Sequence, residues 1–178
     1  TADPKIVASD LVGQAEHGHD SQVILVSTSE TILNESIEAI KTQLADLPRQ
    51  EFAESALKNS QFILLKSKEE AIELLNEYGA EHLILACENP EDFADSITNA
   101  GSIFLGHYTP ESAGDYASGT NHTLPTNGFA KAYSGVNLDS FMKSMTFQKI
   151  TEKGIQNIGK SIEIMAEAEG LQAHKNAV

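Results

Sequence analysis

The 178-residue chain contains very little cysteine and no tryptophan. Its one cysteine is Cys87. A single cysteine excludes an internal disulfide and any cysteine-based zinc finger. Because Cys87 closes the apolar run 83–87, we expect a buried thiol rather than a nucleophile. This cysteine usage fits a reducing cytoplasm.

Basic residues are also scarce: 12 lysines and arginines stand against 26 acidic residues, a formal net charge of -14. A protein that tracks nucleic-acid phosphates needs a basic face, and anionic membranes attract basic segments. No apolar run reaches the ~20 residues of a membrane span, and no signal peptide is visible. We therefore predict a cytoplasmic protein with neither nucleic acid nor membrane as partner.

Apolar runs and helical patterns alternate along the first three quarters of the chain. The expected strands are 22–27, 62–65, 83–87 and 102–105, and the expected helices are 5–18, 29–47, 51–57, 68–78 and 90–99. Continuous apolar strands between helices indicate a parallel sheet covered on both faces. The sequence therefore predicts an α/β fold, a partial doubly wound (Rossmann-like) sheet, over residues 1–136.

The pattern changes after Pro125. We expect a helix at 138–145, a long amphipathic helix at 151–168, and a short tail at 170–178 with no obvious packing mate. Residues 137–178 are therefore predicted to form a helical C-terminal arm. Neither GxGxxG nor GxxxxGK[ST] occurs, so no nucleotide-phosphate cradle is recognisable in the chain.

The segment from Pro110 to Pro125 is strongly polar and has little apolar content. Such a segment is typical of a surface loop that presents side chains. It directly follows the fourth expected strand, and ligands of doubly wound sheets bind beyond the carboxyl ends of the strands. We therefore predict a loop that forms one wall of a binding site.

Two pairs of polar residues could contribute chemistry to that site. Gln14 and His17 share one face at the end of the first helix, as half of a metal site or as a solvated helix end. Glu81 and His82 open the third strand, where a glutamate can share the proton work of a histidine. The alternative is a chance dipeptide at a strand start.

The remaining candidates lie later in the chain. Asp115 follows Gly114 and could bind a metal or an ammonium group, and His122 adds an imidazole nearby. Glu169 and His174 lie in the tail. The tail is either a frayed terminus or a segment that docks on a partner subunit and delivers ligands across the interface.

Taken together, these residues resemble histidinol dehydrogenase over essentially the whole chain. The most specific block runs from Ser112-Ala113-Gly114-Asp115-Tyr116 to Asn121-His122-Thr123-Leu124-Pro125. Further matching motifs are Gln14-Ala15-Glu16-His17, Glu81-His82-Leu83, Asn99-Ala100-Gly101, Phe104-Leu105-Gly106, Glu169-Gly170-Leu171 and Ala173-His174.

The resemblance implies a zinc enzyme that oxidises L-histidinol to L-histidine through L-histidinal with two NAD, at the end of histidine biosynthesis. It implies Zn2+ ligands at Gln14, His17, Asp115 and His174, with the last supplied by the other subunit of a homodimer that exchanges its C-terminal tails. It also implies that Glu81 activates water and that His82 accepts protons. His122 and Glu169 match positions that contact the substrate.

Two features depart from the family pattern. The family usually has proline before the Glu-His pair, where this chain has Ala80. The family enzyme also carries a large N-terminal portion with most of the NAD contacts, so the resemblance implies a C-terminal part that lacks NAD-dependent activity alone. The alternative function is a non-enzymatic zinc-binding or dimerisation module of the same fold.

Overall fold

The computed structural model describes all 178 residues, which form two compact units, Thr1–Ser140 and Phe141–Val178. The first unit alternates helices and strands, and the second contains helices only. In chain order the helices and strands of the first unit are α1 (Pro4–Ala15), β1 (Ile24–Ser27), α2 (Glu30–Leu44), α3 (Gln50–Lys58), β2 (Gln61–Leu64), α4 (Lys68–Tyr78), β3 (Ala80–Leu85), α5 (Pro90–Ala94), β4 (Ala100–Leu105) and α6 (Glu111–Tyr116).

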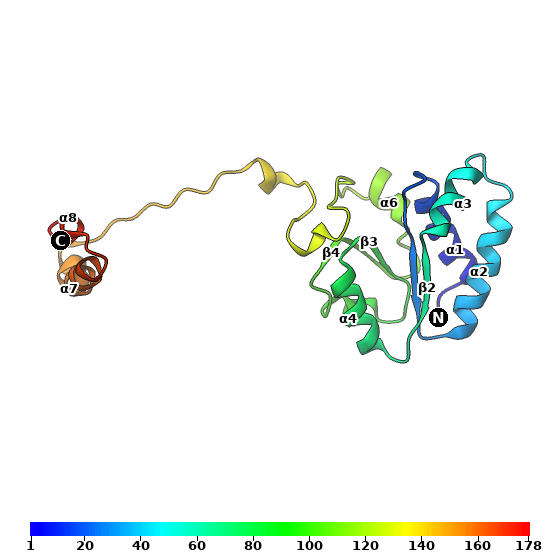
Figure 1. Ribbon diagram of the computed structural model, residues 1–178, viewed down its shortest axis with the longest axis horizontal. Coiled ribbons are helices and arrows are strands. Elements are labelled where there is room, and N and C mark those ends of the chain that lie inside the picture. Colours follow the sequence, from blue (N-terminus) through cyan, green and yellow to red (C-terminus); the bar gives the residue numbers. More distant parts are fainter. The chain divides into compact units, whose positions relative to one another are not determined.

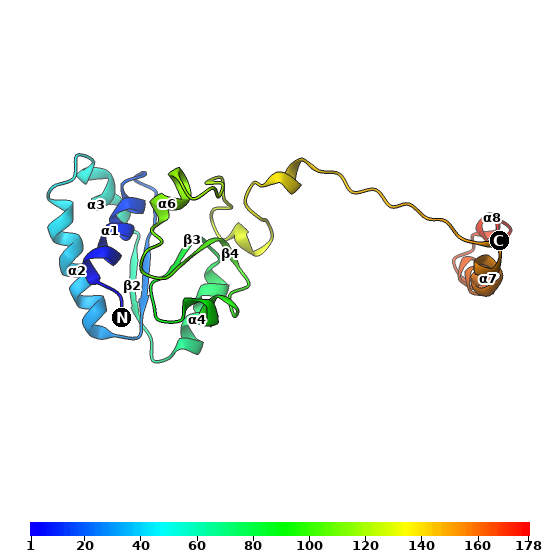
Figure 2. The same ribbon diagram turned by 180° about the vertical axis from the view of Figure 1, so that it is seen from behind.

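The strands form two parallel pairs. β1 pairs with β2, in a register that sets Ile24 opposite Gln61, and β3 pairs with β4, in a register that sets His82 opposite Ser102. Helices α1, α2 and α3 gather on one side of the β1–β2 pair (Figure 1), and Figure 2 shows the same layer from behind. The predicted α/β class with parallel pairing is confirmed.

Helix α1 leads to the candidate site residues Gln14 and His17, and its packing against α2 holds it in place. Pro4 occupies its first turn and Asp3 caps it by accepting from the backbone N–H of Lys5. The small apolar face formed by Ala8 and Val12 is buried against α2, where Ile40 joins the same cluster. The end of α1 is therefore held in place by burial rather than by helix propensity alone.

Capping residues predicted from the sequence act as expected in other helices. The Ser29 hydroxyl accepts from Ile32 N–H at the start of α2, and the Ser67 hydroxyl accepts from Glu70 N–H at the start of α4. Helix α4 ends at Gly79, whose φ of 64° lies in the left-handed region that favours glycine. The polypeptide then enters β3 directly.

Two helix predictions were wrong. The predicted helix at 90–99 ends at Ala94, because the Asn76 side chain accepts from Thr98 N–H and donates to Ser96 C=O, which holds that segment in a turn. The predicted helix at 138–145 is only the 3₁₀ turn η2 (Leu138–Phe141). The apolar side chains of residues 138–145, such as Met142 and Met145, are exposed, so no packing stabilises a helix there.

The segment from Pro110 to Pro125 also differs from the predicted loop. Its first part is the helix α6, in which Glu111 and Gly114 are buried. Gly114 is essential to this packing, because a Cβ there would lie 2.6 Å from Cε1 of Phe104 in β4. The 3₁₀ turn η1 (Phe129–Lys131) follows later, after the turns that contain His122.

The second unit consists of α7 (Glu152–Ala168) and α8 (Gln172–Lys175). The tail has a packing mate after all, since Lys175 Nζ lies 2.8 Å from Glu167 Oε2 and Leu171 N–H donates to Ala166 C=O at 2.8 Å. The pair still leaves apolar surface in water: Ile158, Ile164 and Met165 are 45%, 56% and 65% exposed. None of the helices in the chain combines the length and the apolar character that crossing a membrane requires.

Candidate metal and acid/base site

The site begins at the C-terminal end of α1. Gln14 lies in its last turn and is half-buried, and His17 follows the helix end and is exposed. The backbone N–H of His17 donates to Gln14 C=O at 3.3 Å, which continues the helical spacing past Ala15. Both side chains therefore share one face of this helix end, as the sequence predicted.

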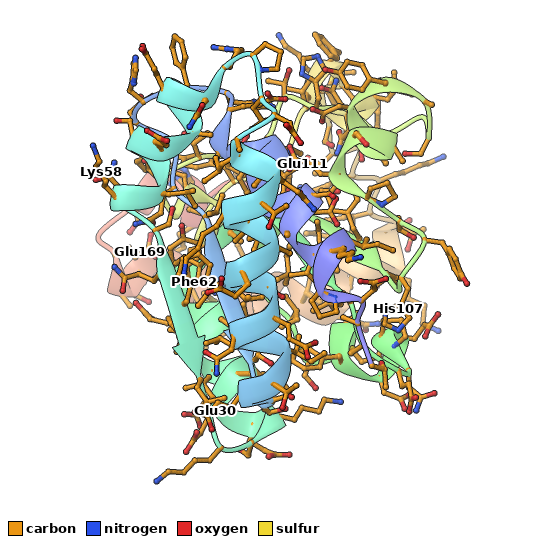
Figure 3. The ribbon with its side chains drawn as sticks, turned by 90° about the vertical axis from the view of Figure 1, so that its right-hand side faces the viewer. Glu30, Lys58, Phe62, His107, Glu111 and Glu169 are labelled. Carbon is orange, nitrogen blue, oxygen red and sulfur yellow. The ribbon has the colours of Figure 1, made fainter.

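The opposite wall is α6. Glu111 and Asp115 lie four residues apart, one turn along this helix, and so point in the same direction. His17, Glu111 and Asp115 each offer a ligand atom, and the three atoms lie within 4.8 Å of one another. Figure 3 labels Glu111 beside α1. A cavity of about 300 Å³ opens between α1 and α6 and is lined by all three residues.

Gln14 contacts the cluster through a paired hydrogen bond. Its amide group faces both carboxylate oxygens of Glu111, and we assign the amide nitrogen to this side, from which it can donate to Oε1 at 2.8 Å and to Oε2 at 3.1 Å. The reverse orientation would set the amide oxygen against two carboxylate oxygens that can only accept while Glu111 is ionised. The amide oxygen of Gln14 is therefore turned away from Glu111.

His82 reaches the cluster from β3. Its Nδ1 lies 3.8 Å from Glu111 Oε1 and its Nε2 lies 3.9 Å from Asp115 Oδ1, too far for hydrogen bonds. The buried Nε2 has no hydrogen-bond partner within the chain. Burial lowers the pKa of His82, which favours the neutral imidazole. A neutral, unpartnered ring nitrogen can accept a proton from a bound molecule.

The cluster carries an excess of negative charge. Burial raises the pKa of the Glu111 carboxyl to about 7, and repulsion from nearby carboxylates adds to the rise. These carboxylates are those of Asp115, Asp10 and Glu81. Burial also raises the pKa of Glu81, an effect that His17 opposes and Asp115 reinforces. No lysine or arginine forms an ion pair with these groups, so the site suits a bound cation.

The site lies against the β3–β4 pair rather than beyond its carboxyl end. His82 is the third of the six residues of β3, and Phe104 of β4 packs against both His82 and Gly114. The prediction of a site beyond the strand ends was wrong in this respect. Because Gly114 has no side chain, α6 approaches the strands closely enough for its carboxylates to face His82.

The structure brings together five of the eight predicted site residues. Gln14, His17, His82 and Asp115 lie in the cluster, and the pKa of Glu81 responds to His17 and Asp115. His122 is exposed and its side chain makes no hydrogen bond or ion pair. Glu169 caps α7 and His174 lies on α8 in the second unit, where both are exposed. The roles of all eight residues stay predictions.

Glu111, the most deeply buried carboxylate of the cluster, is a site residue that the sequence did not predict. Its signal was its place four residues before Asp115, which puts both carboxylates on one side of a helix. Because the segment was expected to be a loop, this four-residue spacing was not read as placing the two carboxylates on one side of a helix. Buried acidic residues are rare unless they are paired, so Glu111 marks the site independently.

The residues present fit a zinc ion. Zinc binds imidazole nitrogen and carboxylate oxygen, and structural or catalytic sites use three or four such ligands. His17 and Asp115 supply one ligand of each kind, the amide oxygen of Gln14 is turned away from Glu111 in the assigned orientation, and the uncompensated carboxylates favour a cation. The chain offers no comparable fit for a dinucleotide, because it lacks a glycine-rich phosphate loop.

Comparisons with known proteins agree with this geometry. The family model described as histidinol dehydrogenase matches residues 1–178. The chain is 58% identical over its whole length to histidinol dehydrogenase from Bacteroides thetaiotaomicron, of which it covers 42%, and 56% identical to that of Haemophilus influenzae, again over its whole length and 42% of the relative. The crystal structure of histidinol dehydrogenase from Elizabethkingia anophelis matches with a TM-score of 0.96 and 61% identity, over 99% of this chain and 41% of that one.

The chain is an α/β protein that gathers imidazole and carboxylate side chains beside a cavity, a set of residues that can bind a cation. The chain belongs to the histidinol dehydrogenase family. It spans about two fifths of the length of the relatives it matches.

Proposed function

We propose that this chain is the C-terminal part of a zinc-dependent histidinol dehydrogenase, which oxidises L-histidinol to L-histidine through L-histidinal with two NAD. The observation that carries the proposal is the cluster itself. His17, Glu111 and Asp115 converge within 4.8 Å beside a buried His82 nitrogen that has no partner in the chain. A substrate that offers an alcohol, an amine and an imidazole would satisfy both the charge and the vacant hydrogen-bonding capacity of this site.

Gln14, His17 and Asp115 would hold the zinc ion, with His174 from the other subunit of a homodimer as the fourth ligand. Bound zinc would orient the amine and imidazole of the substrate. The proximity of His17 and Asp115 supports their assignment directly. The assignment of His174 rests on the family motif Ala173-His174, and its exposure leaves the imidazole available to a partner.

His82 would accept the proton of the substrate hydroxyl in the first oxidation and that of the aldehyde hydrate in the second. Its depressed pKa keeps the imidazole neutral and ready to accept. Glu81 would activate the water that adds to the aldehyde, and burial, which raises its pKa, brings it closer to neutral pH. His122 and Glu169 would contact the substrate, with Glu169 suited to its ammonium group.

NAD would accept the hydride in each oxidation. The chain contains no phosphate-binding loop, so the remaining portion of the family's length would supply most of the NAD contacts. We therefore expect no NAD-dependent activity from this chain alone. We place the complete enzyme in the cytoplasm.

Dimerisation with exchanged tails is supported by exposed apolar side chains in the segment that leads to α7. Phe141, Met145 and Phe147 are 79%, 75% and 89% exposed in the segment that leads to α7. Large apolar side chains that gather in one exposed segment are typical of an interface. A second subunit that covers it would also bring its own tail to the metal site.

The test is zinc content and histidinol oxidation, measured with and without the remaining portion of the Bacteroides thetaiotaomicron relative supplied in trans. We expect stoichiometric zinc, no turnover by the chain alone, and NADH formation after complementation. Activity of the chain alone would contradict its role as a part. Zinc binding without turnover after complementation would favour a non-enzymatic zinc-binding or dimerisation module.

A further inference from the structure

The buried Glu111 has no assigned role in the proposed set of zinc ligands and catalytic residues. It is nevertheless the centre of the cluster: it is 7% exposed, and its two oxygens lie 2.8 and 3.1 Å from the amide end of Gln14 that we assign as the nitrogen. No cationic side chain neutralises it. Burying a carboxylate costs free energy, so we expect a function for its close contact with Gln14.

That function follows from the chemistry of the amide. Only the oxygen of a glutamine side chain can bind a metal ion, because the NH2 group is a donor with no available lone pair. An unrestrained amide can rotate and present either end. In the assigned orientation both carboxylate oxygens of Glu111 accept from the Gln14 nitrogen, so the amide oxygen, Oε1, is the end turned away from Glu111.

We propose that Glu111 is a positioning residue that fixes the Gln14 amide so that its Oε1 is presented to the metal ion held by His17 and Asp115. The proposal rests on the proposed role of Gln14 as a zinc ligand. Partners of this kind orient metal-binding groups in many metalloproteins, and their loss costs about 10- to 100-fold in metal affinity.

Direct binding of the metal by Glu111 is the competing explanation, because its carboxylate also lies within 4.8 Å of the ligand atoms of His17 and Asp115. The two explanations differ in how Glu111 and Gln14 depend on each other. A positioning residue acts through Gln14 and loses its effect when Gln14 is removed. A separate ligand contributes whether Gln14 is present or not.

A double-mutant cycle distinguishes them. Cobalt(II) and zinc affinity would be measured by chelator competition on the full 178-residue chain, alone and with the remaining portion of the relative in trans. The variants are Gln14→Ala, Glu111→Ala and the double variant, with circular dichroism to check folding. We expect about a 10- to 100-fold loss for each single variant and no further loss in the double variant. The visible spectrum of bound cobalt(II) should show the same change in all three.

Glu111→Gln is the matched conservative variant, since its amide oxygen can still accept one hydrogen bond from Gln14. We expect it to retain more affinity than Glu111→Ala. Additive losses in the double variant, or a cobalt spectrum that changes again when Glu111 is removed from Gln14→Ala, would overturn the positioning role. If Gln14→Ala leaves affinity unchanged, the proposed zinc ligand set fails and the positioning role fails with it. If only the Glu111 variants lose affinity, Glu111 is itself a ligand.

Discussion

The two units of the chain differ in the kind of side chain that has no partner within the chain: polar in the first unit and apolar in the second. In the first, carboxylates gather in a partly buried cluster with no cation to balance them, and a buried histidine nitrogen lacks a partner. In the second, with the segment that leads to it, large apolar side chains lie in water. A folded protein normally avoids both situations. We therefore expect the first unit to bind a cation and the second to bind an apolar surface.

The largest expected effect is on metal binding by the first unit. His17→Ala removes an imidazole ligand and should weaken zinc binding by more than about 100-fold, beyond the loss typical of residues that only support a ligand. His19→Ala is the matched control, because His19 stacks on Phe52 at 4.2 Å and lies outside the cluster. Isothermal titration with zinc would check both. Equal losses in the two variants would contradict the assigned site.

A second comparison concerns how tightly each unit is packed. Gly114→Ala sets a Cβ 2.6 Å from the Phe104 ring and should destabilise the first unit by about 1–3 kcal/mol. Gly159→Ala in α7 meets only the end of the Val178 side chain at 2.8 Å, which can move, so its effect should be small. Urea denaturation followed by circular dichroism measures both.

Gly13→Ala provides the positive control for these glycine variants. No atom lies within 4 Å of the added Cβ, and the residue lies inside α1, so alanine should stabilise the helix by about 1 kcal/mol. Loss of stability in all three variants would show that helix geometry, rather than the contact with Phe104, decides the result.

A third prediction concerns the exposed apolar segment. The double variant Phe141→Ser, Phe147→Ser should weaken self-association about tenfold or more, because exposed aromatic side chains commonly dominate interfaces. Sedimentation velocity would measure the dissociation constant. The thermal stability of the first unit in the monomer should not change. An unaltered association constant would place the interface elsewhere.

The smallest expected effect is on the pH dependence of stability in metal-free protein. The pKa of Glu111 is about 7 in the folded protein against an ordinary value of 4.5, so the folded state holds this proton more tightly. The resulting stabilisation is present below about pH 4.5 and is lost as pH rises toward 7. Glu111→Gln should remove this contribution and flatten the profile of unfolding free energy over that window.

The lowered pKa of His82 acts in the opposite direction, since its stabilisation is lost as pH falls below the ordinary histidine value of 6.5. The informative quantity is therefore the difference between parent and Glu111→Gln at each pH. A difference that stays constant from pH 4 to 8 would contradict the raised pKa of Glu111.

The sequence predicted the regular elements of the first unit well, because capping residues and apolar periodicity are local signals. Ser29 and Ser67 both cap helices as expected. It failed where distant contacts decide the structure. Asn76 hydrogen-bonds the segment after the shortened helix α5, and α6 packs closely on Phe104 at Gly114. The site residues of α1 and β3 were predictable from their motifs, whereas Glu111 required the helix that the sequence did not reveal.

The central claim is that the chain provides three ligands of a zinc site that a second subunit completes. A crystal structure of the zinc-loaded protein, with anomalous scattering recorded at the zinc edge, tests it most directly. The account predicts one peak per chain, bound by Gln14 Oε1, His17 and Asp115, with His174 from another subunit as fourth ligand and Glu111 hydrogen-bonded to Gln14. A peak away from these residues, or zinc bound without His17 and Asp115, would contradict it.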